Sequence, residues 1–150
     1  GGGGGGAARA GRAREVRGGS AKRTVQGSVN PRGAVLAQPA GRRSDTRYDL
    51  DLDWDAVVAA AARTGTVLEM NGSPHRLDLS VERARRALEA GCLLSIDSDA
   101  HRTTEFEHLA WGISQARRAW VTPADVLNTR SRAALLARLS PPKPRVPSRR

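Results

Sequence analysis

Residues 92–101 read Cys92-Leu-Leu-Ser-Ile-Asp-Ser-Asp-Ala-His101, an uncharged run that passes into alternating acidic residues and a histidine. The run from Cys92 to Ile96 predicts a buried β-strand. Asp97, Asp99 and His101 follow at every second position, so their side chains could project from one edge. Asp and neutral His are ligands of Zn²⁺, Mn²⁺ and Fe²⁺. The stretch therefore predicts either a metal site at a strand end or a capped loop with a surface histidine.

Two strands and two helices are expected before this stretch. Asp53 and Ser80 can each accept backbone N–H groups at a helix start, and Gly65 and Gly91 are suitable stops. The expected order is a strand at 35–37, a helix from 53 to 63, a strand at 66–71 and a helix from 80 to 91.

Helices are expected after the strand at 92–96. Thr104-Glu-Phe-Glu107 has capping-box spacing, which predicts a helix from about Glu105 with Phe106, Leu109, Ala110 and Ile113 on one side. Thr122-Pro123-Ala-Asp125 predicts a short helix with proline in its first turn. A last helix is expected from Ser131 to Leu139, since the prolines that follow cannot continue it.

This alternation of strands and helices predicts an α/β fold with a parallel sheet or barrel. In such folds the chemistry gathers in the loops that follow the carboxyl ends of the strands. The loops after Ala37, Asn71 and Ile96 are therefore the candidate functional loops.

The loop after Asn71 brings an amide, a guanidinium and an imidazole to the same end of the sheet as residues 97–101. Arg76 suits a phosphate oxygen, or it pairs with Asp78 or another surface acid. Glu69 lies within the preceding strand and needs a partner if it is buried. Asn71, Arg76 and Glu69 are candidate residues for holding substrate or supporting metal ligands.

The net charge of +10 is concentrated at the two ends of the chain. Residues 1–47 hold ten Lys and Arg against Glu15 and Asp45, which gives +8, and residues 140–150 add +4. We expect residues 1–33 and 140–150 to be disordered, basic tails that contact nucleic acid at most weakly and without sequence preference. Residues 34–139 then form the folded region.

Cys92 is the only cysteine, which excludes an internal disulfide and a multi-cysteine zinc cluster. No apolar run approaches the roughly twenty residues of a membrane span, and no secretion signal is apparent, so a cytoplasmic location is expected. The chain begins with six glycines, and Met70 is its only methionine. We interpret the chain as a fragment, or as a gene whose start is wrongly assigned.

Several segments occur in an order and spacing that resemble a known family. They are Leu68-Glu-Met-Asn-Gly-Ser-Pro-His-Arg-Leu-Asp-Leu79, Ser95-Ile-Asp-Ser-Asp-Ala-His101, Trp111-Gly-Ile113, Ala116-Arg-Arg-Ala-Trp120 and Asp125-Val-Leu-Asn-Thr129. Together they resemble the C-terminal part of the PHP (polymerase and histidinol phosphatase) domain of bacterial family X DNA polymerases with 3′–5′ exonuclease activity. The resemblance covers residues 35–140.

The resemblance implies a distorted (β/α)₇ barrel with zinc or manganese ions at the carboxyl edge of its strands. Asp99 and His101 match the last two metal ligands of the family. The implied activity is phosphoester hydrolysis, including removal of nucleotides from DNA 3′ ends during repair. Clustered divalent ions neutralise phosphate oxygens and generate hydroxide near neutral pH.

The sequence also departs from the family pattern. Gln38 stands where the family has a metal-binding histidine before Pro39, and residues 1–33 contain no histidine to match the earlier ligands. We therefore expect a partial barrel with an incomplete metal site, which would be inactive alone. Two other functions remain open. They are a stand-alone phosphatase for a small ester such as histidinol phosphate, and a non-catalytic remnant that binds nucleic acid through its tails.

Overall fold

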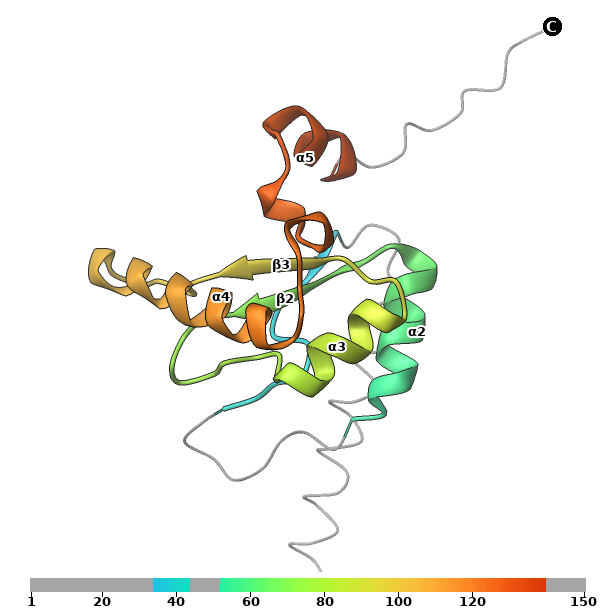
Figure 1. Ribbon diagram of the computed structural model, residues 1–150, viewed down its shortest axis with the longest axis horizontal. Helices are drawn as coiled ribbons and strands as arrows, with labels where there is room; N and C mark the ends of the chain where they lie inside the picture. Colours follow the sequence, from blue (N-terminus) through green and yellow to red (C-terminus); the bar gives the residue numbers. More distant parts are fainter. Residues whose placement is uncertain (1–33, 44–51, 140–150) are drawn as a thin grey trace, which may run out of the picture.

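The computed structural model describes residues 34–43 and 52–139. The tails predicted at 1–33 and 140–150 lie outside these residues. Figure 1 shows the arrangement of the elements. In chain order they are β1 (Val35–Leu36), α2 (Trp54–Thr64), β2 (Val67–Asn71), α3 (Val81–Glu89), β3 (Leu94–Asp97), the 3₁₀ helix η1 (Thr103–His108), α4 (Leu109–Arg118), the 3₁₀ helices η2 (Pro123–Asp125) and η3 (Leu127–Thr129), and α5 (Arg132–Leu139).

The three strands form one parallel sheet in the order β1-β2-β3, which confirms the predicted α/β class. Leu68 pairs with Leu94, and Asn71 pairs with Asp97. The last strand begins at Leu94 rather than at Cys92, because the Cys92 N–H donates to Ala87 O at the end of α3. The described strands make a three-stranded sheet, and the barrel predicted from the resemblance is not shown.

The predicted ends of the first two helices are confirmed. Asp53 Oδ1 accepts the Ala56 N–H at 3.0 Å, and Ser80 Oγ accepts the Arg83 N–H at 3.3 Å. Gly65 ends α2 with φ of 70°, a conformation in which side chains with a Cβ are strained. These caps were predictable because the bonded groups lie within one turn of each other.

The capping box predicted at Thr104 and Glu107 is wrong. The helical segment begins earlier, at Thr103, and its first six residues form η1 rather than an α-helix. The Glu105 carboxylate accepts the His101 N–H at 2.8 Å, so it ties the helix start to the preceding loop. The predicted cap at Thr122 is present, since Asp125 Oδ2 accepts the Thr122 N–H at 2.8 Å.

The core lies between the sheet and the helix layer formed by α2, α3 and α4. Figure 1 shows α3 and α4 on the same side of β2 and β3, with α5 set apart beyond β3. The core includes alternate strand residues and small helix residues, namely Leu68, Met70, Leu94, Ile96, Ala84, Ala87 and Ala116. Because successive strand side chains point to opposite faces, Glu69, Asn71 and Asp97 belong to the other face.

The outer edge of β3 is covered by the segment that follows α4. Val126 forms a parallel bridge with Leu94. The Asn128 amide then acts as a strand would, because its Oδ1 accepts the Ile96 N–H at 3.0 Å and its Nδ2 donates to Ile96 O at 2.7 Å. These contacts satisfy backbone groups that an edge strand otherwise leaves exposed.

The apolar side of η1 and α4 predicted from the sequence faces solvent. Phe106 is 67% exposed, and Leu109 and Ile113 are about 40% exposed. The buried residues of α4 are instead Gly112 and Ala116, which allow the helix to lie close to the sheet. Within the described residues, every helix is too short or too polar to cross a membrane.

Candidate functional site

The loops after β2 and β3 meet at the carboxyl edge of the sheet. The Gly72 N–H donates to Asp97 O at 2.8 Å, which joins the two loops directly after the last strand pair. A Cβ atom at Gly72 would collide with His108 O and lie 2.9 Å from Asp97 O. Gly72 is therefore required for the close approach of β2, β3 and the start of α4.

Glu69 and Asp97 form a close pair of carboxyl groups on the face of the sheet turned away from the helices. The pKa of Glu69 is raised to about 7, chiefly by burial and in smaller part by the charge and side-chain hydrogen bond of Asp97, although the Gln38 N–H opposes these effects. Burial also raises the pKa of Asp97. Two carboxyl groups this close favour sharing one proton, and we assign that proton to Glu69.

Asn71 organises the loop that carries Arg76. Its Oδ1 accepts the Ser73 N–H at 2.9 Å, and its backbone N–H donates to Asp78 O. The Arg76 and Leu77 N–H groups both donate to Ser73 O at 2.8 Å. Asn71 is 2% exposed, so it acts here as a support for the loop and not as a surface group.

Gln38 lies beside this cluster through its backbone. Its N–H donates to Glu69 Oε2 at 2.7 Å, and its φ is 46°, in the left-handed region that non-glycine residues rarely adopt. The loop after β1 therefore reaches the same edge as the loops after β2 and β3, as the parallel topology predicts.

Arg76 pairs with Asp99. The Arg76 Nε lies 3.4 Å from Asp99 Oδ2, and the two side chains are 29% and 25% exposed. The partner predicted as an alternative, Asp78, is instead fully buried and accepts the Arg42 N–H at 3.3 Å. Asp99 has φ of 52°, and its N–H donates to Asp97 Oδ1 at 3.1 Å. This short side-chain contact holds the loop that presents Asp99.

His101 is exposed at the end of the same loop. Its Nδ1 lies 2.7 Å from Asp99 O, which leaves Nε2 as the nitrogen that this contact does not use. Fixing one ring nitrogen on a backbone carbonyl is the usual way of orienting the other as a metal ligand. The geometry therefore agrees with the ligand role predicted for His101, and that role stays a prediction.

The described residues do not by themselves form a complete metal site. Residues 34–43 and 52–139 contain no group of three His, Cys, Asp or Glu side chains placed to hold a metal ion. Of the two predicted ligands, Asp99 faces the Arg76 guanidinium, whose positive charge competes with a cation for the carboxylate. A structural or catalytic zinc ion takes at least three protein ligands. Any metal ion here would need ligands beyond these two.

A hollow of about 470 Å³ lies beside Asp99 and His101. It is lined by the chain's three histidines and by three arginines, namely His75, His101, His108, Arg43, Arg76 and Arg102, and we call it the Arg-His hollow. Sequence reasoning assigned no role to Arg43, Arg102 or His108. The sequence did contain a sign that Arg102, Glu105 and His108 lie together. They are three residues apart, and residues at this spacing share one side of a 3₁₀ helix.

Comparison with known proteins supports a relationship over most of the chain. No protein-family model matches it. The chain is 36% identical over 110 residues to the DNA polymerase/3′-5′ exonuclease PolX of Bacillus subtilis (strain 168). This match covers 73% of the chain but only 19% of the length of that protein. The identity supports a PolX-related PHP region in this chain.

Proposed function

We propose that this region contributes the last two metal ligands and a phosphate-binding loop to a PHP-type phosphoesterase that removes nucleotides from DNA 3′ ends. The observation that carries the proposal is the 3.4 Å contact of Arg76 with Asp99, because it joins the loops after β2 and β3 at the edge where the PolX-like motifs lie. The 36% identity to a polymerase with 3′-5′ exonuclease activity supports the choice of DNA as substrate.

Each residue at this edge has a distinct part in the proposal. His101 and Asp99 would hold a divalent ion, zinc or manganese, together with ligands outside the described residues. Arg76 would bind a phosphate oxygen when a metal ion draws Asp99 away from it. Asn71 and Glu69 position these groups, since Asn71 bonds within the Arg76 loop and Glu69 bonds to Asp97 and Gln38.

Gln38 provides the sharpest test, because it occupies the position of a family metal ligand. We expect the unchanged chain to degrade 5′-labelled single-stranded DNA from its 3′ end slowly or not at all with Mn²⁺ or Zn²⁺. Gln38→His should raise the affinity for Zn²⁺ by about tenfold or more, the scale on which changes around metal sites act. Metal affinity is measured by competition with a chromogenic chelator.

The control removes the predicted ligands. In the Gln38→His background, Asp99→Ala and His101→Ala should each abolish the gained affinity and any DNA hydrolysis. Asp55→Ala, which removes an exposed carboxylate on α2 paired with Arg86, should change neither. Unchanged zinc affinity in Gln38→His, or hydrolysis that survives both ligand substitutions, would contradict the assignment. Turnover of histidinol phosphate without DNA hydrolysis would favour the small-ester phosphatase.

A further inference from the structure

We propose that two copies of this chain associate through the exposed side of η1 and α4, with the two helical segments antiparallel. The contact is made by four apolar residues on one side of this segment, which we call the α4 stripe, namely Phe106, Leu109, Ala110 and Ile113. None of them lines the Arg-His hollow. The proposal therefore goes beyond the proposed function and does not depend on it.

The α4 stripe has the composition of a buried helix side but is open to solvent. Phe106 is 67% exposed, and Leu109 and Ile113 are 39% and 41% exposed. Their spacing places them on one side of a helix. The helix packs on the sheet through a neighbouring side, with Gly112 and Ala116. A group of exposed apolar side chains, unlike a single one, indicates a contact with another protein surface.

The charges at the two ends of the segment favour a second copy as the partner. Its start carries Glu105 and Glu107, and its last turn carries Arg117 and Arg118. In an antiparallel pair the start of one helix lies beside the end of the other. Carboxylates therefore meet guanidinium groups at both ends of the contact, whereas a parallel pair would place like charges together.

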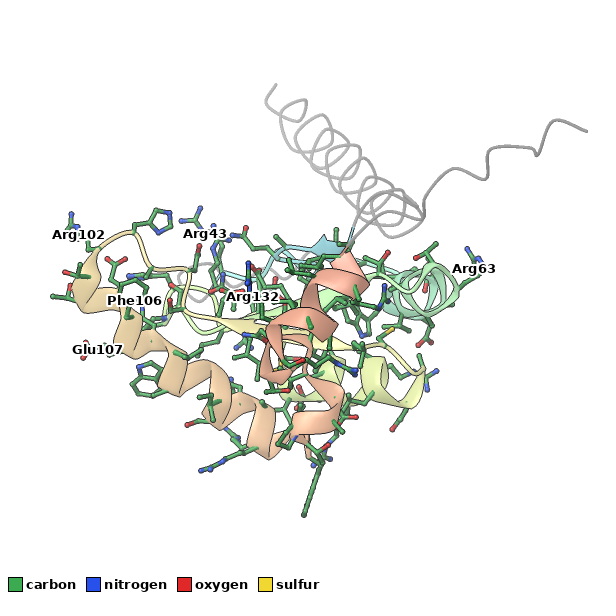
Figure 2. The ribbon with its side chains drawn as sticks, turned by 90° about the horizontal axis from the view of Figure 1, so that it is seen from above. Arg43, Arg63, Arg102, Phe106, Glu107 and Arg132 are labelled. Carbon is green, nitrogen blue, oxygen red and sulfur yellow. The ribbon has the colours of Figure 1, made fainter. Side chains whose placement is uncertain are left out.

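Glu107 and Arg117 are the residues best placed to meet across this contact. Both are exposed, and neither forms an ion pair with another residue of 34–43 or 52–139. Glu105, in contrast, accepts the His101 N–H at 2.8 Å. Figure 2 shows Phe106 and Glu107 on the same helical segment, at the opposite end of the molecule from Arg63. Figure 1 shows that the start of this segment extends beyond the end of β3.

A two-fold axis makes such a contact complementary to itself. Each copy supplies the same residues, so the contact of Glu107 with Arg117 occurs twice, and the assembly closes as a dimer instead of growing into a filament. The α4 stripe covers only about two helical turns. Interfaces of small area are typical of transient complexes, so we expect a weak dimer with a dissociation constant in the micromolar range.

Sedimentation velocity of the full chain at a series of concentrations measures this association. We expect an equilibrium between monomer and dimer. Ile113→Glu should weaken it by about tenfold or more, because it places a charge within an apolar contact. Leu139→Glu is the matched control, because Leu139 lies on α5 and is 38% exposed, close to the 41% of Ile113. It should leave the dissociation constant unchanged.

Charge reversal tests the antiparallel arrangement. Glu107→Arg and Arg117→Glu should each weaken the dimer by about threefold or more, because each creates two contacts between like charges. An equal mixture of the two variants should associate as tightly as the unchanged chain, since the mixed dimer has opposite charges at both ends. Arg63→Glu, at the other end of the molecule, is the control and should have no effect.

A chain that stays monomeric at every concentration would overturn the proposal, and so would a dimer that Ile113→Glu leaves intact. Charge reversals without effect would overturn the antiparallel arrangement. A mixture that does not recover the association would mean that the reversals act within their own helix, which would also overturn that arrangement. Circular dichroism of each variant checks that it is folded, so that a lost dimer is not mistaken for a lost fold.

Discussion

Asp78 is the most deeply buried ionisable residue among those with a resolved pKa shift. It is 0% exposed, and burial raises the pKa of its carboxyl group to about 6, against opposing hydrogen bonds from Arg42 and its neighbours. Its Oδ2 accepts the Arg42 N–H, whereas its Oδ1 has no hydrogen-bond partner. A proton on Oδ1 would remove the cost of burying the charge. The folded protein therefore binds this proton more tightly than the unfolded chain does.

This difference predicts how stability depends on pH. The raised pKa stabilises the fold fully below about pH 4, and the contribution is lost as the pH rises through about 6. Asp78→Asn removes the ionisation, so its free energy of unfolding relative to wild type should rise by about 2 kcal/mol between pH 4 and pH 7. Urea unfolding at a series of pH values measures this change.

The comparison with wild type matters because Glu69 also has a raised pKa, of about 7, and acts in the same direction. Subtracting the wild-type free energy of unfolding from that of Asp78→Asn at each pH removes the contribution of Glu69 and leaves that of Asp78. Glu107→Gln removes a carboxyl group from an exposed residue and should leave the slope unchanged. A stability difference between Asp78→Asn and wild type that does not vary with pH would show that Asp78 keeps its charge in the fold.

At the scale of elements, the contact of β2 with α4 depends on Gly72. An added Cβ would meet the backbone of His108, Asp97 and Gly112, and backbone atoms cannot move aside as a side chain can. Gly72→Ala should therefore lower the free energy of unfolding by about 1–3 kcal/mol, the usual cost of overpacking. It should also shift the amide NMR signals of Asp97 and Asp99, because Gly72 bonds to the Asp97 carbonyl.

Gly91→Ala separates local strain from this effect on the site. Gly91 has φ of 81° but no atom within 4 Å of an added Cβ, so the substitution strains only the backbone at the end of α3. It should lower stability without moving the signals of Asp97 and Asp99. Equal shifts in both variants would mean that Gly72 has no special part in joining the two loops.

A second prediction about the elements concerns Asn128, which covers the edge of β3. Asn128→Ala would leave the N–H and C=O of Ile96 without their partners, and should cost about 1–3 kcal/mol of unfolding free energy. Asn128→Asp keeps the acceptor for the Ile96 N–H but places a carboxylate oxygen against Ile96 O, where two acceptors repel each other, so its cost should be at least as large as that of Asn128→Ala. Chemical denaturation ranks the three proteins. An Asp variant clearly more stable than the Ala variant would argue against the amide donor being needed at Ile96 O.

For the molecule as a whole, the sequence predicted those features whose bonded groups are close together in the chain. The caps at Asp53 and Ser80 and the stop at Gly65 follow from groups within one helical turn. The contact of Asn128 with Ile96 was not predictable, because 32 residues separate them and nothing local marks it. The failed cap at Thr104 has a different cause. Glu105 lies only four residues after His101, but it bonds to the preceding loop instead of to the helix start predicted at Thr104, and the helical segment begins earlier.

In the candidate site, too, the general arrangement was predictable from the sequence and the individual long-range contacts were not. The parallel topology was enough to predict that the loops after β1, β2 and β3 share one edge. It did not predict that Arg76 would pair with Asp99, because the choice among nearby acids depends on the path of both loops. The Arg-His hollow was missed because its three arginines come from three separate loops, and each alone resembles an ordinary surface charge.

The charge distribution leads to a last prediction for the whole molecule. The net charge of residues 34–139 is zero, since they hold fourteen basic and fourteen acidic residues, whereas residues 1–33 and 140–150 carry +6 and +4. Binding of single-stranded DNA outside the Arg-His hollow should therefore come from the ends of the chain. We expect a chain of residues 34–139 to lose this weak binding, as measured by fluorescence anisotropy with a labelled oligonucleotide.

The salt dependence identifies the source of that binding. For single strands the logarithm of the binding constant falls with the logarithm of the salt concentration, with a slope of about 0.7 for each phosphate neutralised. The full chain should show a steep slope and the shortened chain a shallow one, because three arginines remain in the hollow. Equal slopes would place the DNA contacts within residues 34–139 instead, and would then make Arg43 and Arg102 the first residues to substitute.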